Sequence, residues 1–178
     1  MSSTNGHKKY DAILVAGEGK SSYKVHHQNK AFLTINGKCL VHYIVETLQQ
    51  VESIQDIYLV GLKDKLQQVF LSEHVDLNYP KRIHIVEQKS NLYENVWHTF
   101  LQSLQDENGE VPNIESHLDR AVLIVPCDAP LMTSQEVEYF ISHADMENHD
   151  HVLGLTSREK LKYFYPRDGK PGIKMAYL

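Results

Sequence analysis

The sequence has few cysteines and no long apolar run. Its 178 residues include only two cysteines, Cys39 and Cys127, far apart and in apolar surroundings. We therefore expect reduced thiols in a cytoplasmic protein rather than a disulfide framework. No stretch approaches the roughly 18 consecutive apolar residues that a membrane helix needs. The apolar run Ala12–Ala16 is also too short for a signal-peptide core. These absences predict a protein that does not enter a membrane.

Positive charge is scarce as well. The formal net charge is −5, which gives no general attraction to nucleic acid. A small anionic ligand remains compatible, because backbone N–H groups can hold an anion without net positive charge. The eleven histidines do not form the set of three or four converging ligands that zinc requires. The expected partner is therefore a small anion and not a nucleic acid.

Apolar runs rich in β-formers alternate with segments of helical period, which is typical of βαβ units. The four helical stripes begin near Leu40, Leu66, Val96 and Ser134, and Thr133 with Glu136 fits a capping box at the last of them. The predicted strands are Ala12–Ala16, Ile57–Gly61, Ile83–Glu87, Ala121–Pro126 and His151–Thr156. This pattern predicts a single α/β domain over residues 1–178, a three-layer sandwich with a mostly parallel, Rossmann-like sheet. Residues 166–178 look like a loop entering a strand, so either the chain ends there or the sequence is the N-terminal part of a longer protein.

A glycine loop, Gly17-Glu18-Gly19-Lys20-Ser21-Ser22, directly follows the first strand. Glycines allow a sharp turn and bring backbone N–H groups close to phosphate oxygens, although an ordinary tight turn explains two glycines about equally well. A P-loop needs a glycine at position 14, which is Leu14. The dinucleotide fingerprint needs a third glycine at position 22, which is Ser22. Neither pattern fits.

Three blocks in order resemble the opening of the MobA-like nucleotidyltransferases. In that family a strand ending in LAAGxG leads through a loop to a PK-x-L segment and then to NGKPL before a helix. The matching blocks here are Leu14–Gly19, Asn29–Leu33 and Ile35–Leu40. The segment Cys127–Thr133, after the fourth strand, resembles the family's vPxDxPLl. The resemblance implies a nucleotidyltransferase (GT-A) fold.

The resemblance also implies an activity. An NMP would pass from an NTP to a small phosphorylated acceptor, such as a sugar phosphate, an alditol phosphate or a molybdopterin-like compound, with release of pyrophosphate and dependence on Mg²⁺. Lys30 and Asp128 would be the catalytic residues, and Asp128 would bind the metal. The nucleotide would contact Ala16, Gly17, Gly19, Lys20, Ser21 and Asn95, the last at the base edge. From the residues alone, Asp128 remains a candidate turn residue or helix cap, and Asn95 a candidate cap or solvated helix residue.

Two positions depart from the family pattern. Ser21 stands where active relatives usually carry an arginine that braces the triphosphate, and Asn29 stands where they carry a proline. Serine cannot make the bidentate phosphate contact of arginine. A nucleotide-binding sensor or pseudoenzyme with the same fold is therefore the alternative function. A phosphotransferase that uses Gly19-Lys20-Ser21 is disfavoured by Leu14, and the oligomeric state is left open.

Replacing Gly19 distinguishes a phosphate-binding loop from a plain turn. If its N–H faces phosphate, Gly19→Ala weakens nucleotide binding more than it lowers stability, because the added Cβ obstructs the ligand. A plain turn predicts the reverse, a loss of about 1 kcal/mol where φ is positive and no ligand-specific effect. Thermal unfolding and calorimetric nucleotide affinity, measured on the same variant, decide between the two.

Overall fold

The computed structural model describes residues 8–18, 29–72, 79–106, 108–111, 113–155 and 160. The chain forms two compact units, Met1–His143 and Ala144–Leu178, and all the helices and strands named below belong to the first. The expectation of a single domain stays a prediction. None of the helices in the described ranges is long and apolar enough to cross a membrane.

The main element of the first unit is a four-stranded sheet in the order β5-β4-β1-β6, with every pair of neighbours parallel. Strands β2 and β3 form a separate antiparallel pair. In chain order the elements are β1 (Tyr10–Val15), η1 (Lys30–Phe32), β2 (Thr34–Ile35), β3 (Lys38–Cys39), α1 (Leu40–Gln49), β4 (Ile54–Gly61), α2 (Lys63–Ser72), β5 (Ile83–Glu87), α3 (Leu92–Ser103), η2 (Ile114–His117), β6 (Val122–Pro126) and α4 (Ser134–His143). The predicted α/β class with a parallel sheet is confirmed.

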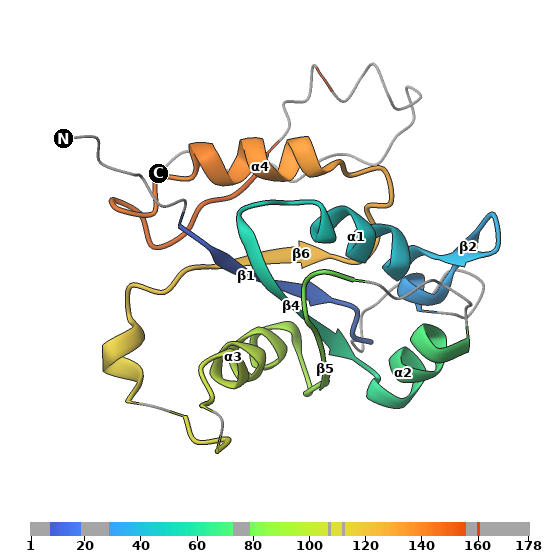
Figure 1. The fold of residues 1–178 in the computed structure, drawn as a ribbon, viewed down its shortest axis with the longest axis horizontal. Helices are drawn as coiled ribbons and strands as arrows, with labels where there is room; N and C mark the ends of the chain where they lie inside the picture. The colour runs from blue at the N-terminus through green and yellow to red at the C-terminus, as the bar shows by residue number, and fades with distance from the viewer. Residues whose placement is uncertain are drawn as a thin grey trace. The chain divides into compact units, whose positions relative to one another are not determined.

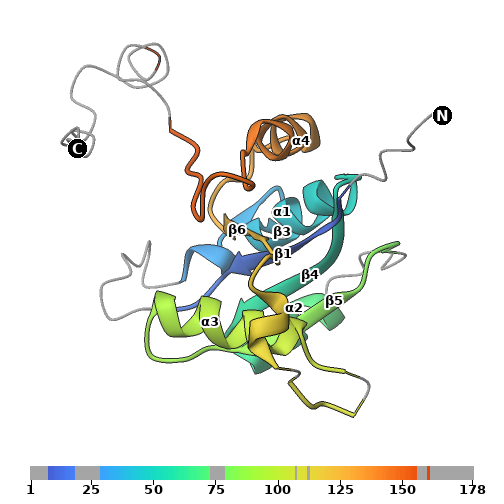
Figure 2. The same ribbon diagram turned by 90° about the vertical axis from the view of Figure 1, so that its left-hand side faces the viewer.

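Helices cover both faces of the sheet, because successive side chains of a strand point to opposite sides. Ala12 and Leu14 of β1 belong to the core that includes residues of α1, α2 and α4. Ile13 belongs to a second core, to which Val96 and Phe100 of α3 contribute. Figure 1 shows α1 and α4 above the sheet and α3 below it, and Figure 2 shows the same three layers after a quarter turn. The predicted three-layer arrangement is therefore present.

The predicted strand His151–Thr156 is wrong where the structure describes it. Residues 151–155 have no regular secondary structure, and Thr156 lies outside the described residues. Leu153 and Leu155 are 62% and 72% exposed. A short apolar run becomes a strand only when a neighbouring strand takes up its backbone hydrogen bonds, and that condition is not visible in the local sequence.

Two buried carboxylates lie near the amino ends of neighbouring strands. Asp11 of β1 is 4% exposed and accepts a hydrogen bond from Arg120, which precedes β6. Asp56 of β4 is 6% exposed and pairs with Arg82, 2.7 Å away. Burial, followed by the charges of Asp11 and Asp56, raises the pKa of Tyr58 to about 12. The Asp11–Arg120 pair connects β1 to the start of β6 outside the backbone ladder.

We expect Arg120→Ala to lower the free energy of unfolding by about 2–3 kcal/mol, because it leaves the buried Asp11 carboxylate without its cation. Urea unfolding measures the loss. In the double variant Asp11→Leu/Arg120→Met both charges are absent, so it should be more stable than Arg120→Ala alone. A single variant as stable as the wild type would show that the pair does not hold β6 to β1.

Candidate functional site

The order of strands reverses direction at β1. From β1 the chain builds outward through β4 and β5 on one side, and then places β6 on the other side. In open parallel sheets, such a reversal leaves a crevice beyond the carboxyl ends of the strands, where ligands bind. A pocket of about 350 Å³ lies there, between the ends of β1 and β6, within the size range of small-molecule sites. Its lining includes Val15, Gly17, Lys30, Ile124 and Asp128.

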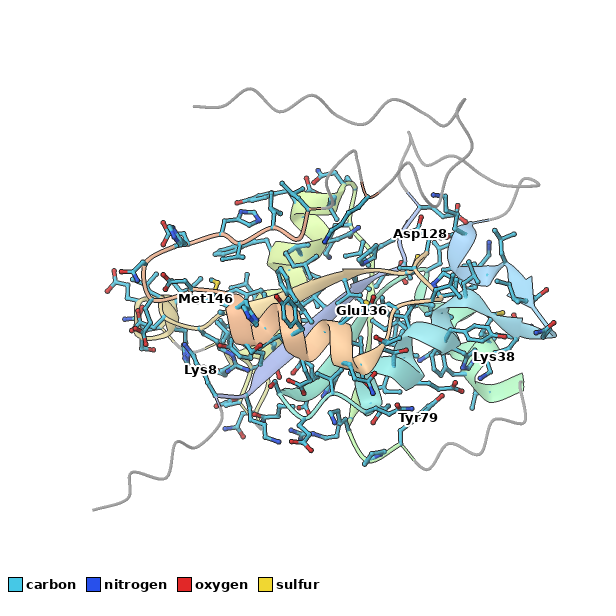
Figure 3. The ribbon with its side chains drawn as sticks, turned by 90° about the horizontal axis from the view of Figure 1, so that it is seen from above. Lys8, Lys38, Tyr79, Asp128, Glu136 and Met146 are labelled. Atoms are coloured by element: carbon cyan, nitrogen blue, oxygen red, sulfur yellow. The ribbon has the colours of Figure 1, made fainter. Side chains whose placement is uncertain are left out.

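A larger hollow of about 670 Å³ lies at the other end of the sheet, against α4. It is lined by residues at the start of β1, before β4 and along α4, among them Lys8, Ser53 and Glu138. Figure 3 shows Lys8 and Asp128 at opposite ends of the molecule's first unit. None of the sequence-predicted site residues that the structure describes lines this hollow, whereas Gly17, Lys30 and Asp128 line the smaller pocket, which is therefore the candidate site.

Lys30 and Asp128 meet in the candidate pocket although 98 positions separate them in the chain. The Nζ atom of Lys30, in η1, lies 2.7 Å from Oδ2 of Asp128, which follows β6. Their side chains are 43% and 37% exposed, so both reach solvent and a ligand. The hydrogen bond and the negative charge of Asp128 raise the pKa of Lys30. Sequence reasoning named both residues, and the structure brings them together.

Asn29 fixes the place of Lys30. Its side-chain oxygen accepts a hydrogen bond from the N–H of Ala31, 2.9 Å away, which caps η1. Its side-chain nitrogen donates to the carbonyl of Ala16, 2.8 Å away, at the end of β1. One amide therefore connects the helix that carries Lys30 to the strand that precedes the glycine turn. Sequence reasoning treated Asn29 only as a missing proline, although asparagine before a short helix is a recognised capping signal.

Hydrogen bonds to β4 and to the residue that follows β5 hold the turn after β1 in place. The N–H of Ala16 donates to the carbonyl of Val60 at 2.8 Å, and the N–H of Glu18 donates to Oε1 of Gln88 at 2.7 Å. Gly17 lines the pocket. The remaining predicted residues of the loop, Gly19, Lys20 and Ser21, lie outside the described residues.

Asn95 is buried in α3, with 6% of its surface exposed. Its side-chain oxygen accepts a hydrogen bond from the N–H of Lys89. It does not line the pocket, whereas Leu92, one turn earlier in the same helix, does. The base contact predicted for Asn95 stays a prediction.

The pocket offers one carboxylate, that of Asp128, to a hard cation such as Mg²⁺. The neighbouring Cys127 is buried, and burial together with the charge of Asp128 raises the pKa of its thiol to about 11. Within the described ranges, no three His, Cys, Asp or Glu residues gather as a metal site. Mg²⁺ is commonly held by one or two carboxylates together with substrate phosphates. The half-exposed Asp128 carboxylate fits that mode.

Similar folds occur among cytidylyltransferases of known structure. One is 4-diphosphocytidyl-2C-methyl-D-erythritol synthase from Anaerococcus prevotii, with TM-score 0.51 and 16% identity over 76% of this chain and 50% of that protein. Another is a cytidylyltransferase from Leptospira borgpetersenii, with TM-score 0.51 and 11% identity over 81% of this chain and 51% of that protein. The chain thus spans about half the length of these proteins. At such low identity the likeness concerns the fold.

A sequence model of a protein family gives the stronger comparison. The model described as the MobA-like NTP transferase domain matches residues 12–167. This range contains the turn after β1, Lys30 and Asp128. No curated protein matches the chain in sequence.

Replacing Asn29 tests how Lys30 is positioned. We expect Asn29→Ala to lower stability by about 1 kcal/mol, the usual cost of a lost cap, and to weaken binding of a Mg·NTP although Lys30 is still present. Asn113→Ala is the matched control, because Asn113 caps η2 in the same way, accepting from the N–H of Glu115 at 3.1 Å. Urea unfolding and calorimetry on both variants separate the two effects. Equal nucleotide affinity in both would contradict a role for Asn29 at the site.

Proposed function

Because the chain belongs to the MobA-like NTP transferase domain family, we propose that it transfers the NMP of a nucleoside triphosphate to a small phosphorylated acceptor. An acceptor phosphate oxygen attacks the α-phosphorus of the NTP, the bond from that phosphorus to the bridging oxygen breaks, and pyrophosphate leaves. The observation that carries the proposal is the meeting of Lys30 and Asp128 at 2.7 Å in the crevice where the strand order reverses.

Positioning and electrostatics account for most of the catalysis in this proposal. Lys30 stabilises the charge that develops on the phosphates, and its pairing with Asp128 keeps its ammonium in place before substrate enters. Asp128 holds Mg²⁺, which when bound neutralises phosphate charge. The distance of 2.7 Å between Lys30 and Asp128 supports placing one ammonium and one carboxylate together at the reaction centre.

The phosphates are assigned to the turn after β1. The N–H of Glu18 is occupied by Gln88, so the glycine N–H groups of Gly17 and Gly19 are the proposed cradle, next to Ala16. Lys20 and Ser21 follow as further phosphate contacts. The base contact that the sequence predicted for Asn95 is not part of this proposal, because Asn95 is 6% exposed and does not line the pocket. The chain spans about half the length of the compared proteins, and the acceptor is therefore left as a chemical class.

The alternative is a nucleotide sensor with the same fold, favoured by Ser21 at the usual arginine position. It predicts NTP binding without turnover. The phosphotransferase alternative needed a glycine at position 14, and Leu14 is fully buried within β1. Pyrophosphate release, followed with each NTP and a panel of phosphorylated sugars and alditols, tests transfer directly. Binding with no release from any pair would favour the sensor.

Asp128→Asn tests the metal assignment, because it removes the charge and keeps an oxygen that can accept from Lys30. We expect the Mg²⁺-dependent part of NTP affinity to fall about tenfold to a hundredfold, the range for a lost charge-assisted contact. Thermal stability should stay close to that of the wild type. Asp119→Asn, an equal charge change at an exposed position before β6, should leave affinity unchanged. If calorimetry with and without Mg²⁺ gives the same values for Asp128→Asn and wild type, Asp128 is not the metal ligand.

A further inference from the structure

Two side-chain amides from different elements lie against the turn after β1. Gln88 follows β5, and its Oε1 accepts a hydrogen bond from the N–H of Glu18 at 2.7 Å. The backbone N–H of Gln88 donates to the carbonyl of Gly61, the last residue of β4, at 2.9 Å. Asn95 of α3 accepts a hydrogen bond from the N–H of Lys89. The ends of β4 and β5 are thereby connected to the turn.

Both amides touch the position of Gly17. A Cβ atom on Gly17 would lie 3.0 Å from Oε1 of Gln88 and 3.1 Å from Nδ2 of Asn95. Both distances are shorter than ordinary van der Waals contact between a Cβ and its neighbours. The two amides therefore pack directly on the backbone of the turn, and a Cβ at this position would require them to shift by a few tenths of an ångström.

The environment of Asn95 favours a role through other residues over contact with a ligand. It is 6% exposed, and the hydroxyl of Thr99 donates to its backbone carbonyl at 2.7 Å. Its side-chain oxygen is engaged by Lys89, and its side-chain nitrogen faces Gly17. A buried amide whose hydrogen bonds are made in this way holds its neighbours rigidly, since leaving those groups unpaired is costly.

We infer that Gln88 and Asn95 are a positioning pair that fixes the Gly17–Glu18 turn and the segment 88–89 as one rigid unit. The pair sets the direction of the turn's N–H groups and makes no contact with the base. The phosphate-binding part of this inference rests on the proposed function. Loss of either amide then weakens binding of any ligand with a triphosphate, whatever base it carries.

Binding of inorganic tripolyphosphate separates positioning from base recognition, because this probe has no base. We expect Gln88→Met and Asn95→Leu to weaken Mg·tripolyphosphate and all four Mg·NTPs by a common factor of about ten, the scale of one lost buried hydrogen bond. The affinity ratios among the four NTPs should not change. If tripolyphosphate affinity is unchanged and one NTP alone is weakened, Asn95 or Gln88 reads the base and the inference is overturned.

Hydrogen exchange gives a readout that needs no ligand. In the free protein we expect the amide of Glu18 to exchange about tenfold faster in Gln88→Met, and that of Lys89 in Asn95→Leu, because each loses its acceptor. Gln88 is only half-buried, so Gln88→Met keeps the test decisive if Asn95→Leu fails to fold. Unchanged exchange at Glu18 in Gln88→Met would overturn the inference even if nucleotides bind.

Gln49→Met is the matched control. Gln49 is also a buried amide that holds a backbone segment, accepting from the N–H of Lys81 at 2.8 Å and donating to its carbonyl at 2.9 Å. Lys81 precedes β5, so this pair lies at the end of β5 opposite to Gln88. We expect a stability loss like that of Gln88→Met, with unchanged tripolyphosphate affinity and unchanged exchange at Glu18. A loss of tripolyphosphate affinity in the control would show that general destabilisation explains the effect.

The two proposals can fail separately. If the wild type binds neither Mg·NTP nor Mg·tripolyphosphate, the proposed function is wrong, while exchange at Glu18 and Lys89 still decides whether the amides hold the turn. If the wild type binds both and the variants bind equally well, the positioning pair is wrong and the proposed function is unaffected.

Discussion

Strand β1 forms backbone ladders with β4 on one side and β6 on the other, and Ala12, Ile13 and Leu14 are completely buried. A strand in this position cannot move without breaking both ladders and both cores. The turn that follows it is therefore attached to a strand that is paired on both sides and buried on both faces. Lys30 is connected to the end of β1 through Asn29, and Asp128 follows the neighbouring strand β6. The candidate site depends on this central strand.

Side-chain amides hydrogen-bond to several backbone segments around the sheet. Asn29 connects η1 to β1, Gln88 connects the turn after β1 to the end of β5, and Gln49 holds the segment before β5. An amide suits this task because it offers two N–H donors and two acceptor lone pairs without a charge to desolvate. In a pocket that we propose binds a polyanion, neutral amides also avoid repelling the ligand. This gives a physical reason for the neutral amides of Asn29 and Gln88 close to the proposed phosphates.

Charge is concentrated at both ends of the strands, but in different environments. At the amino ends the carboxylates of Asp11 and Asp56 are buried and paired with arginines, so they stabilise the strand arrangement. At the carboxyl ends Lys30 and Asp128 are more than a third exposed. An ion pair in contact with water contributes little to stability, and it can separate at small cost when phosphates and a metal compete for its members. The same kind of interaction thus serves structure at one end and is available for binding at the other.

The sequence by itself determined the class of fold, and its motifs predicted the two charged residues of the candidate site. The continuous apolar run of β1 and the helical stripes around Ile44 and Phe100 are local patterns, and local patterns are sufficient to assign strands and helices. Lys30 and Asp128 were found because short motifs surround each of them. The tertiary structure alone decided that these two side chains meet, that Asn29 ties η1 to β1, and that Asn95 is buried behind Gly17. Each of these depends on the order of strands in the sheet, which brings together residues separated by many positions in the chain. Residues 151–155 show that a local pattern can also mislead. An apolar segment becomes a strand only if the fold places a neighbouring strand beside it.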